Sequence, residues 1–246
     1  MWEVRRFEEI DSTNTYLRTE ARNGAPDGVV AVAEHQTAGR GRLDRTWESP
    51  AGASLLFSVL LRPQLDPTEL HLCTAAVALA TAEACRIVAQ VDPVLKWPND
   101  LLVGESKLAG VLAEAEFEAG KVSAVIVGIG LNVGWPGPEG VGGTCLDDLA
   151  ATPVDRPQLL EAILRALTAR RAQLDSPAGR QQIAAELQER CATIGQQVRI
   201  ELASGDIVGR ATGINEAGHL MVETPDGTQT IAAGDVVHLR PAPPSP

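Results

Sequence analysis

The sequence has few aromatic residues: four Trp, three Phe and one Tyr occur among its 246 residues. The hydrophobic core must therefore consist mainly of Ala, Val, Leu and Ile. Apolar residues make up 44% of the chain and charged residues 22%, which is typical of a globular protein. This composition excludes a collagen, a low-complexity chain and a disulfide scaffold. The length predicts one large domain, or one large and one small domain.

Paired cysteines are also missing. Cys73, Cys85, Cys145 and Cys191 form no CxxC pair, and none has metal-ligand spacing to a histidine. We therefore predict reduced cysteines in or near the core and no metal site built from a side-chain cluster. The N-terminal sequence MWEVRRFEEI has no signal-peptide pattern, and no uncharged stretch is an unbroken membrane span. These absences favour a cytoplasmic protein.

The sequence has few basic residues. It contains 21 Lys and Arg residues but 32 Asp and Glu residues, which gives a net charge of −11. Such a chain is repelled by nucleic acids and by anionic membranes, so we expect neither as a partner. The sequence also contains no GxxxxGK[ST] phosphate loop and no GxGxxG dinucleotide fingerprint. A nucleotide, if bound, is held in another way.

The hydrophobic pattern predicts an α+β unit over residues 1–195 and a small all-β unit over 196–240, followed by a disordered tail at 241–246. In the first unit a helix capped by Ser12 or Thr13 ends at Asn23-Gly24. A second helix begins with Asp66 as N-cap and ends near Ala89. We expect the other elements of this unit to be strands at 2–7, 28–33, 54–61, 94–97, 101–103, 107–117 and 122–129, and two helices after Pro153. In the second unit, five short strands between residues 198 and 239 are joined by tight turns and predict a small barrel.

The segment 39–47, GRGRLDRTW, is the strongest local signal. It places three arginines within six residues of an acidic chain, and arginine is a multi-donor cation suited to carboxylates and phosphates. The interleaved glycines let backbone N–H groups approach an anion closely. Trp47 offers a flat face to a ring. The alternative is a solvated loop whose arginines pair with surface acids.

Four further motifs are weaker when each is taken alone. KWPND (96–100) is partly explained as a turn, although a turn does not require its Lys and Trp. Strict strand alternation in KLAGVLAE (107–114) puts Lys107, Ala109, Val111 and Ala113 on one face, with Lys107 able to reach an anion near Gly110. GIGLN (128–132) ends a strand with two glycines where a ligand can approach. STN (12–14) is explained by helix capping or by a polar ligand.

Taken together and in this order, STN, EHQTAGRGRLDRTW (34–47), KWPND, KLAGVLAE and GIGLN resemble the biotin–protein ligases, over about residues 5–240. The resemblance implies a mixed sheet with flanking helices, like that of class II aminoacyl-tRNA synthetases, followed by an SH3-like β domain. It implies ATP-dependent activation of biotin to biotinyl-5′-AMP, with Mg²⁺ accompanying the phosphates. The biotinyl group then passes to a lysine of a biotin carboxyl carrier domain.

The resemblance also implies roles for individual residues. The ureido end of biotin is assigned to Ser12, Thr13, Asn14 and Gln36, and the rest of its pocket to Gly110, Leu112, Gly128 and Gly130. The carboxylate and α-phosphate are assigned to Arg40, Gly41, Arg42 and Lys107. The remainder of ATP is assigned to Arg45, Trp47, Asn99 and Asn132, with Trp47 over the adenine and Asn132 at its amino edge. Asp100 receives the acceptor lysine, so that Lys107, Arg40 and Asp100 form the catalytic set.

The sequence departs from the family pattern at two places. Asp44 stands where the loop usually has Gly, and Asp tolerates a positive φ better than most residues. Thr212 stands where some members carry an Arg that reaches ATP; Arg210 lies nearby, and we do not assign it that role. The bifunctional members begin with a DNA-binding winged helix, whereas this sequence begins in the ligase region, so we expect no operator binding. We expect a monomer or a weak homodimer.

Two other functions stay open at this point. A lipoate or octanoate ligase on a related fold would activate a fatty carboxylate, but STN and GRGR favour biotin. A non-catalytic biotin or adenylate sensor would bind without releasing pyrophosphate, but the presence of Lys107, Arg40 and Asp100 argues against it.

Overall fold

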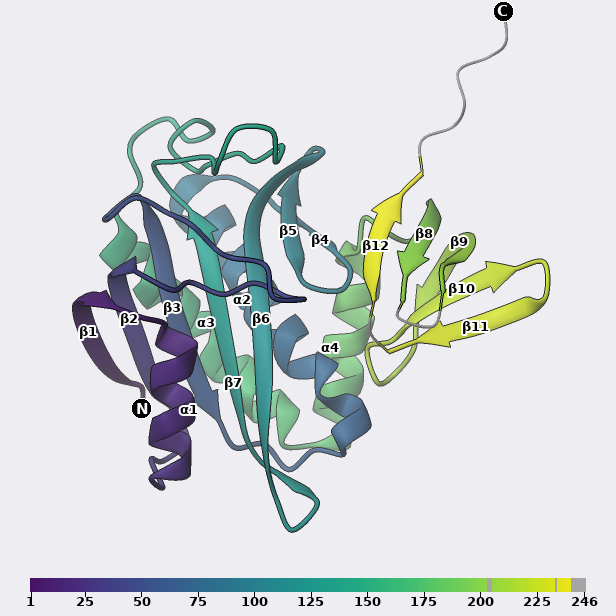
Figure 1. Ribbon diagram of the computed structural model, residues 1–246, viewed down its shortest axis with the longest axis horizontal. Coiled ribbons are helices and arrows are strands. Elements are labelled where there is room, and N and C mark those ends of the chain that lie inside the picture. Colours follow the sequence, from purple (N-terminus) through teal and green to yellow (C-terminus); the bar gives the residue numbers. More distant parts are fainter. Residues whose placement is uncertain (203–204, 233, 240–246) are drawn as a thin grey trace, which may run out of the picture.

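The computed structural model describes residues 1–202, 205–232 and 234–239 and has two sheets (Figure 1). The larger sheet has seven strands in the order β1-β2-β3-β7-β6-β5-β4, with β1 parallel to β2 and all other pairs antiparallel. The α+β fold with a mixed sheet is therefore confirmed. Its strands are β1 (Glu3–Ile10), β2 (Val29–Gln36), β3 (Ser54–Leu61), β4 (Val94–Lys96), β5 (Asp100–Val103), β6 (Ser106–Glu118) and β7 (Lys121–Asn132).

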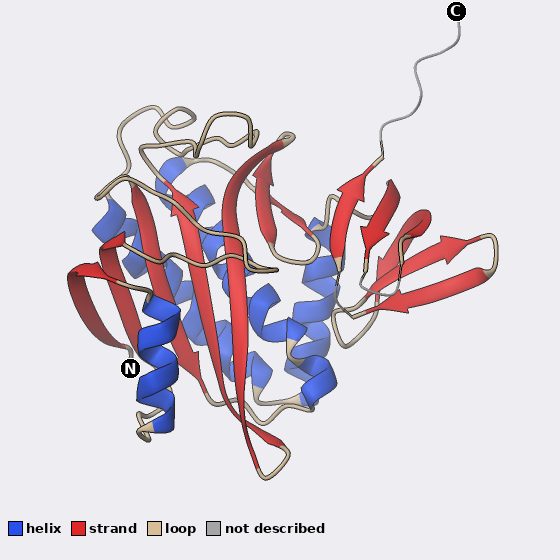
Figure 2. Cartoon of the chain, in the orientation of Figure 1, coloured by secondary structure: helices blue, strands red, loops and turns tan. Residues whose placement is uncertain are grey.

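Helices cover both faces of this sheet, as Figure 2 shows. The helices are α1 (Thr13–Arg22), α2 (His71–Ala89), α3 (Arg156–Leu174) and α4 (Pro177–Arg190). On one face α1 packs Leu17 and Ala21 against Leu60, Ala124 and Ile126. The other face is covered by α2 and α3 and forms the larger core. Because both faces are covered, the inner strand β3 is buried at every position.

The helix α1 covers only part of its face of the sheet. Ala124 and Ile126 of β7 lie beneath α1, and the next residues with the same strand parity are Gly128 and Gly130. The N-terminus of α1 is capped by Ser12, whose side chain accepts a hydrogen bond from the Thr15 N–H. The face beyond this N-terminus is therefore floored by glycines, and it is here that the candidate site lies.

Two local predictions were wrong in instructive ways. The capping box of Asp66 and Glu69 is present, but it caps a 3₁₀ turn, η1 (Pro67–Glu69), and α2 begins only at His71. In β6, Leu102 pairs with Lys107 and Leu101 with Ala109, so Leu108 is an extra residue. This bulge reverses the alternation, and the Lys107 side chain lies on the face of Gly110 instead of that of Ala109 and Val111.

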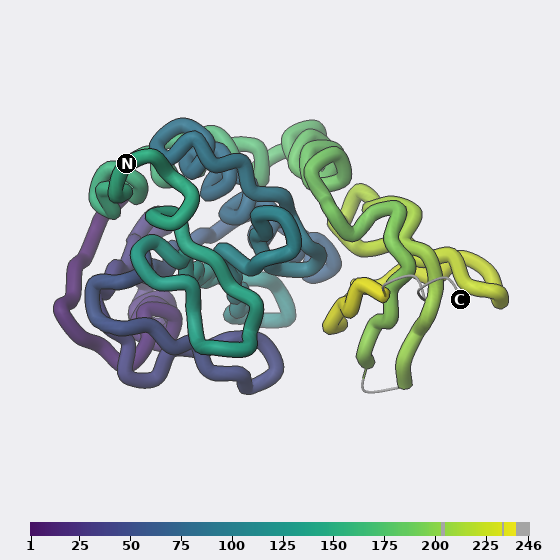
Figure 3. Tube along the Cα trace, turned by 90° about the horizontal axis from the view of Figure 1, so that it is seen from above, coloured from purple at the N-terminus to yellow at the C-terminus, as the bar shows by residue number. Residues whose placement is uncertain are grey.

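The second sheet has five antiparallel strands in the order β11-β10-β9-β8-β12, as expected for an SH3-like β domain. The strands are β8 (Gln197–Glu201), β9 (Ile207–Ile214), β10 (Leu220–Thr224), β11 (Gly227–Ile231) and β12 (Asp235–His238). It lies to one side of the main body, next to α4 (Figure 3). The expected disordered tail at 241–246 lies outside the described residues.

Trp97 joins the two parts of the molecule. Its side chain is 1% exposed, and its indole Nε1–H donates to the carbonyl of Gly218 in the β9–β10 turn at 3.0 Å. Its backbone N–H donates to the hydroxyl of the buried Thr193, which also contacts His238 Nε2. The tryptophan of KWPND is therefore an anchor for the C-terminal sheet.

The segment Pro67–Ala89 is long and apolar enough to cross a membrane by composition, but 78% of its most apolar window is buried inside the protein. It contains the core helix α2, which packs between the large sheet and α3.

A pH dependence of stability follows from His71, at the start of α2 beside Trp97. Its ring is 5.4 Å from the Trp97 ring, and its buried Nε2 has no hydrogen-bond partner among the described residues. Burial, assisted by repulsion from His219 and Arg42, lowers the pKa of His71 from 6.5 to about 3. The unfolded chain therefore binds one more proton than the folded chain between these pH values. We expect His71 to lower the free energy of unfolding as the pH falls below 6.5, by at most about 1.4 kcal/mol per pH unit.

Urea unfolding of the parent and of His71→Gln at pH 7 and pH 4.5 measures this contribution, because glutamine binds no proton in this range. The parent should lose more stability than the variant between the two pH values. An equal loss in both proteins would show that His71 does not contribute.

Candidate active site

Glycines form the floor of a cavity of about 650 Å³ on the α1 face of the large sheet. Gly110 of β6 pairs directly with Gly130 of β7, and Gly128 lies two residues earlier on the same face. A Cβ atom at Gly130 would overlap the Trp47 indole, and one at Gly128 would overlap Asn14 Oδ1. Gly128 and Gly130 therefore need glycine because side chains from other elements lie directly on the strand, and Gly110 leaves little room beside Trp47 and Lys107.

One end of the cavity is polar and is built around the first turn of α1. Thr13 and Asn14 are buried there, and the Thr13 N–H donates to Gln36 Oε1 at 2.8 Å. Ser58, in the middle of β3, donates to Asn14 Oδ1 at 2.6 Å and lies 2.7 Å from Thr13 Oγ1. This end offers several fixed donors and acceptors to a polar ring.

The loop between β2 and β3 crosses in front of β7 and β6, where Figure 1 shows it in dark blue. Its tip is a tight hairpin: Arg40 and Thr46 form an isolated bridge, and the Gly41 N–H donates to the Arg45 carbonyl at 2.6 Å. Leu43 and Asp44 both have positive φ, at 53° and 57°. Asp44 thus adopts the left-handed backbone conformation for which glycine is favoured.

Four of the cations that line the cavity are each paired with a carboxylate. Arg40 contacts Glu114 at 3.1 Å, and the Lys107 Nζ lies 2.7 Å from Asp100 Oδ1. Both Arg42 and Arg45 contact Asp235 of β12. The cavity thus concentrates cations whose charge is neutralised by carboxylates of the protein. An anionic ligand can take the place of these carboxylates.

Arg42 is the most enclosed of the loop arginines. Its guanidinium donates to Asn99 Oδ1 at 3.2 Å and to the Gly234 carbonyl at 3.1 Å. Burial lowers its pKa from the ordinary value, and the charges of Asp235 and Asp100 oppose this shift. The loop is therefore held from both sides, by KWPND and by the C-terminal sheet.

Trp47 lies flat on the glycine floor. Its ring contacts the Gly110 and Gly130 positions, and the Lys107 Nζ is 5.6 Å from the ring centroid. Its buried Nε1 has no hydrogen-bond partner within the described part of the chain. The indole thus occupies a flat slot on the sheet beside the cationic centre.

Two asparagines of the cavity have structural contacts of their own. Asn132 Nδ2 donates to the carbonyls of Pro136 and Thr144, so both amide hydrogens hold the loop after β7. An adenine amino group could meet only the Oδ1 atom of Asn132 in this conformation. Asn99 Nδ2 donates to the Val111 carbonyl, which leaves Oδ1 for Arg42.

Every residue that the sequence assigned to the site lines this one cavity. From α1, β2 and the loop these are Ser12, Thr13, Asn14, Gln36, Arg40, Gly41, Arg42, Arg45 and Trp47; from later elements they are Asn99, Asp100, Lys107, Gly110, Leu112, Gly128, Gly130 and Asn132. Their individual roles stay predictions. No cluster of His, Cys, Asp or Glu that could hold a metal ion occurs in the residues described.

The sequence analysis assigned no role to three residues that make contacts in the site. Ser58 lies at the centre of a wholly buried apolar strand. A polar residue at such a position in the sequence could have indicated a buried hydrogen-bond partner. Glu114 ends the KLAGVLAE motif but received no role. Asp235 comes from the C-terminal sheet, and nothing in the local sequence relates it to Arg42 and Arg45. The C-terminal residues that line the cavity are Glu201, Asp235, Val236 and Val237.

The chain is similar to known proteins over most of its length. Residues 6–132 match the family model "Biotin/lipoate A/B protein ligase family", and residues 193–239 match "Biotin protein ligase C terminal domain". A biotin–[acetyl-CoA-carboxylase] ligase of Mycobacterium tuberculosis is 40% identical over 240 residues, covering 94% of this chain and 87% of the relative. One of Paracoccus denitrificans is 33% identical, covering 92% of this chain and 96% of the relative. A biotin protein ligase from Aquifex aeolicus, solved in complex with biotin and ATP, superimposes with a TM-score of 0.82 at 29% identity, covering 98% and 100% of the two chains.

Proposed function

The chain belongs to the biotin/lipoate A/B protein ligase family, and from this premise we propose that it activates biotin with ATP and transfers the biotinyl group to a carrier lysine. The observation that carries the proposal is the convergence of Arg40, Arg42 and Lys107 over a glycine floor, next to the polar end formed by Thr13 and Asn14. A ligand with a polar ring at one end and a carboxylate at the other fits this order of groups.

In the first step the biotin carboxylate oxygen attacks the α-phosphorus of ATP, and pyrophosphate leaves with the electrons of the broken P–O bond. Two anions must approach each other, so positive charge has to lie where charge accumulates. Lys107 is placed for this, because the bulge at Leu108 brings its Nζ onto the face of Gly110. Arg40 and Arg42 add charge-assisted donors that exchange their present carboxylate partners for the ligand.

In the second step the amine of the acceptor lysine attacks the mixed anhydride carbonyl; an amide forms and AMP leaves. The attacking amine must lose a proton, and we assign its acceptance to Asp100, the carboxylate beside Lys107. The loop of residues 39–47, with Trp47 against the floor, shields the anhydride from water.

ATP brings Mg²⁺, which neutralises charge on its phosphates. Arg45, at the exposed edge of the loop, meets the same phosphates. We assign the acceptor to a biotin carboxyl carrier domain, as the names of the relatives suggest. We place the catalytic unit in residues 1–195 and the C-terminal unit in 196–240 of a cytoplasmic enzyme.

Mass spectrometry of the protein with biotin, ATP and Mg²⁺, without any acceptor, tests the proposal. Formation of biotinyl-5′-AMP together with pyrophosphate would support it. Parallel reactions with lipoate and octanoate test the alternative acid substrates. Biotin binding without pyrophosphate release would instead identify a sensor, and the absence of both would overturn the assignment.

Replacement of Arg42 by alanine is expected to release the adenylate prematurely. Arg42 connects the loop to Asn99 and to the C-terminal sheet, so its loss removes contacts on both sides of the closed loop. We expect the dissociation rate of biotinyl-5′-AMP to rise by about 10-fold or more, equivalent to about 1.4 kcal/mol for the lost charge-assisted contacts. Stopped-flow dissociation measures it, and Arg86→Ala, on the exposed side of α2, is the matched control. Adenylate retention equal to that of the parent would contradict the assigned role.

A further inference from the structure

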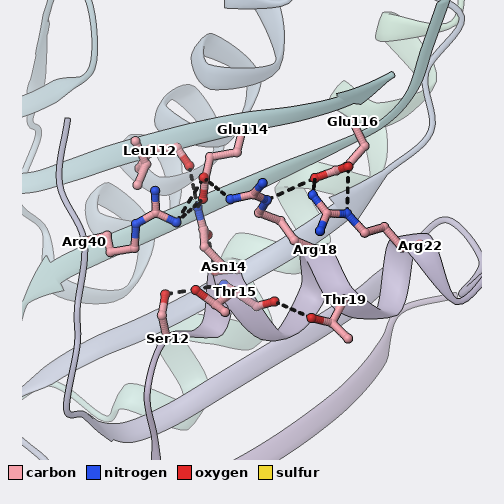
Figure 4. Close-up of polar contacts among 11 residues, drawn as sticks. Ser12, Asn14, Thr15, Arg18, Thr19, Arg22, Arg40, Leu112, Glu114 and Glu116 are labelled. Carbon is pink, nitrogen blue, oxygen red and sulfur yellow. Dashed lines mark hydrogen bonds and ion pairs between the residues drawn. The ribbon is translucent and has the colours of Figure 1, made fainter. Parts of the chain in front are cut away.

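Glu114, in the half-buried second part of β6, lies between the polar end of the cavity and the arginine loop. Its carboxylate accepts from Asn14 Nδ2 at 2.9 Å and from Arg18 at 2.9 Å, and it contacts Arg40 at 3.1 Å (Figure 4). The side chain is 15% exposed. One carboxylate thus joins a residue of α1's first turn to a residue of the loop.

Two acceptors fix the orientation of the Asn14 amide: the Glu114 carboxylate and the Leu112 carbonyl, which accepts from Asn14 Nδ2 at 3.2 Å (Figure 4). An ionised carboxylate only accepts hydrogen bonds, so the NH₂ group of Asn14 must face it. The Asn14 Oδ1 atom then faces Ser58, which must donate its one hydroxyl proton at 2.6 Å. Asn14 therefore has no freedom to exchange its oxygen and nitrogen positions.

The orientation passes on to Thr13. Because Ser58 has given its proton to Asn14, the 2.7 Å contact between Ser58 Oγ and Thr13 Oγ1 must use the proton of Thr13. Gln36 Oε1, 3.0 Å from Thr13 Oγ1, is a second acceptor of the same proton. The chain of hydrogen bonds then runs in one direction, from Thr13 through Ser58 and Asn14 to Glu114. Thr13 Oγ1 keeps only lone pairs for the cavity, so it accepts from a ligand N–H.

Arg18 and Arg40 differ in how firmly they are held. Arg18 is also bound by Glu116 at 3.0 Å, and Glu116 in turn binds Arg22, as Figure 4 shows. The hydrogen bond from the Arg22 guanidinium lowers the pKa of the Glu116 carboxyl, and burial partly opposes this effect. Arg18 lowers the pKa further, so that it lies below the ordinary value. Arg40 is 42% exposed and lies on the loop. Glu114 thus has a fixed side toward α1 and an exchangeable partner on the loop.

We propose that Glu114 is a positioning residue that directs the hydrogen-bond chain toward acceptance of the ligand's ring N–H and docks Arg40 of the loop in the ligand-free protein. This inference rests on the proposed function, since the ring is the ureido ring of biotin. Glu114 does not itself line the cavity. It acts through Asn14, Ser58 and Thr13 at one end and through Arg40 at the other.

The test compares Glu114→Gln with Glu116→Gln. Both variants remove one carboxylate charge from the same strand and from the same arginine cluster, but Glu116 contacts neither Asn14 nor Arg40. Glutamine at 114 presents an NH₂ group that competes for the orientation of the chain. We expect the biotin Kd measured by calorimetry to rise about 10-fold or more in Glu114→Gln. It should change less than about 2-fold in Glu116→Gln, and Glu114→Asp should recover part of the affinity.

Coupling and loop docking provide two readouts that a general loss of stability would not produce. Biotin binding by Glu114→Gln combined with Ser58→Ala should be non-additive, because both changes break one chain. Trypsin should cleave the ligand-free Glu114→Gln protein faster after Arg40, Arg42 or Arg45, with Glu116→Gln like the parent. Thermal unfolding of both variants checks that each is folded.

The outcomes separate this inference from the proposed function. If the parent forms biotinyl-5′-AMP and Glu114→Gln binds biotin as the parent does, only the positioning role is overturned. The same holds if Glu116→Gln loses as much affinity as Glu114→Gln, because the cluster then acts only through its total charge. If the parent binds no biotin, the proposed function fails and this inference fails with it.

Discussion

Replacement of Lys107 by alanine is expected to slow the formation of biotinyl-5′-AMP by about 10²–10³-fold, the usual cost of losing one preorganised group at a developing charge. Lys107 lies on the glycine floor between Trp47 and Asp100, where we propose that the two anionic substrates meet. The side chain is 37% exposed, so its removal leaves no buried void, although Asp100 Oδ1 loses its ion-pair partner. Thermal unfolding of the variant measures the cost of that loss separately. We expect the variant to fold, with at most a modest loss of stability from the unpaired Asp100. Pyrophosphate release at saturating biotin and ATP measures the effect.

Lys121→Ala is the matched control, because Lys121 begins the partner strand β7 of the same hairpin and is exposed. It should release pyrophosphate at the parent rate. If Lys107→Ala also released pyrophosphate at nearly that rate, Lys107 would have no part in adenylation. A defect in carrier transfer alone, with normal adenylation, would move its role to the second step.

Lys107 also marks a limit of strand prediction. The sequence KLAGVLAE predicts a strand, and strict alternation puts its lysine on the face of Ala109 and Val111. The bulge at Leu108 shifts the register by one residue and turns Lys107 to the cavity. Alternation cannot reveal a bulge, because the bulge depends on the pairing with β5. The predicted proximity of Lys107 to Gly110 held, although the face assigned to Lys107 was wrong.

The position of the glycines in the site was easier to predict from the sequence than the orientation of the cationic side chains. Gly128 and Gly130 interrupt an apolar strand, and glycine in a strand marks the close approach of another group. In this protein the approaching groups are Asn14 and Trp47. The capping sequence at Ser12 predicted the start of α1 and thereby the polar end of the cavity, since capping depends on adjacent residues.

Contacts with the C-terminal sheet were beyond local patterns. Asp235 contacts Arg42 and Arg45 across more than half the chain, and Trp97 contacts Gly218 across 121 positions. Such pairs form because the two sheets pack against each other. Neither hydrophobic periodicity nor turn-forming residues predict how two sheets pack. For this reason the sequence placed Trp97 in a motif for chemistry, whereas the structure gives it an anchoring position as well.

The anchoring position predicts the largest effect on stability. Trp97→Ala is expected to lower the free energy of unfolding by about 3–5 kcal/mol, the range for truncation of a large buried aromatic side chain. The change removes a side chain that is 1% exposed and leaves the Gly218 carbonyl without its donor. It also removes the ring against which His71 packs. Chemical denaturation monitored by circular dichroism measures the loss.

Trp97→Phe separates packing from hydrogen bonding, because phenylalanine keeps most of the apolar contact but donates nothing to Gly218. Its loss should be smaller than that of Trp97→Ala, at about 1–3 kcal/mol. If Trp97 holds the C-terminal sheet in place, Trp97→Ala should also increase proteolysis between α4 and β8 in the ligand-free protein. It should weaken adenylate retention as well, because Asp235 would no longer lie beside Arg42 and Arg45. Loss of stability with unchanged adenylate retention would show that Trp97 serves the core alone and that the arginine loop does not depend on the docked sheet.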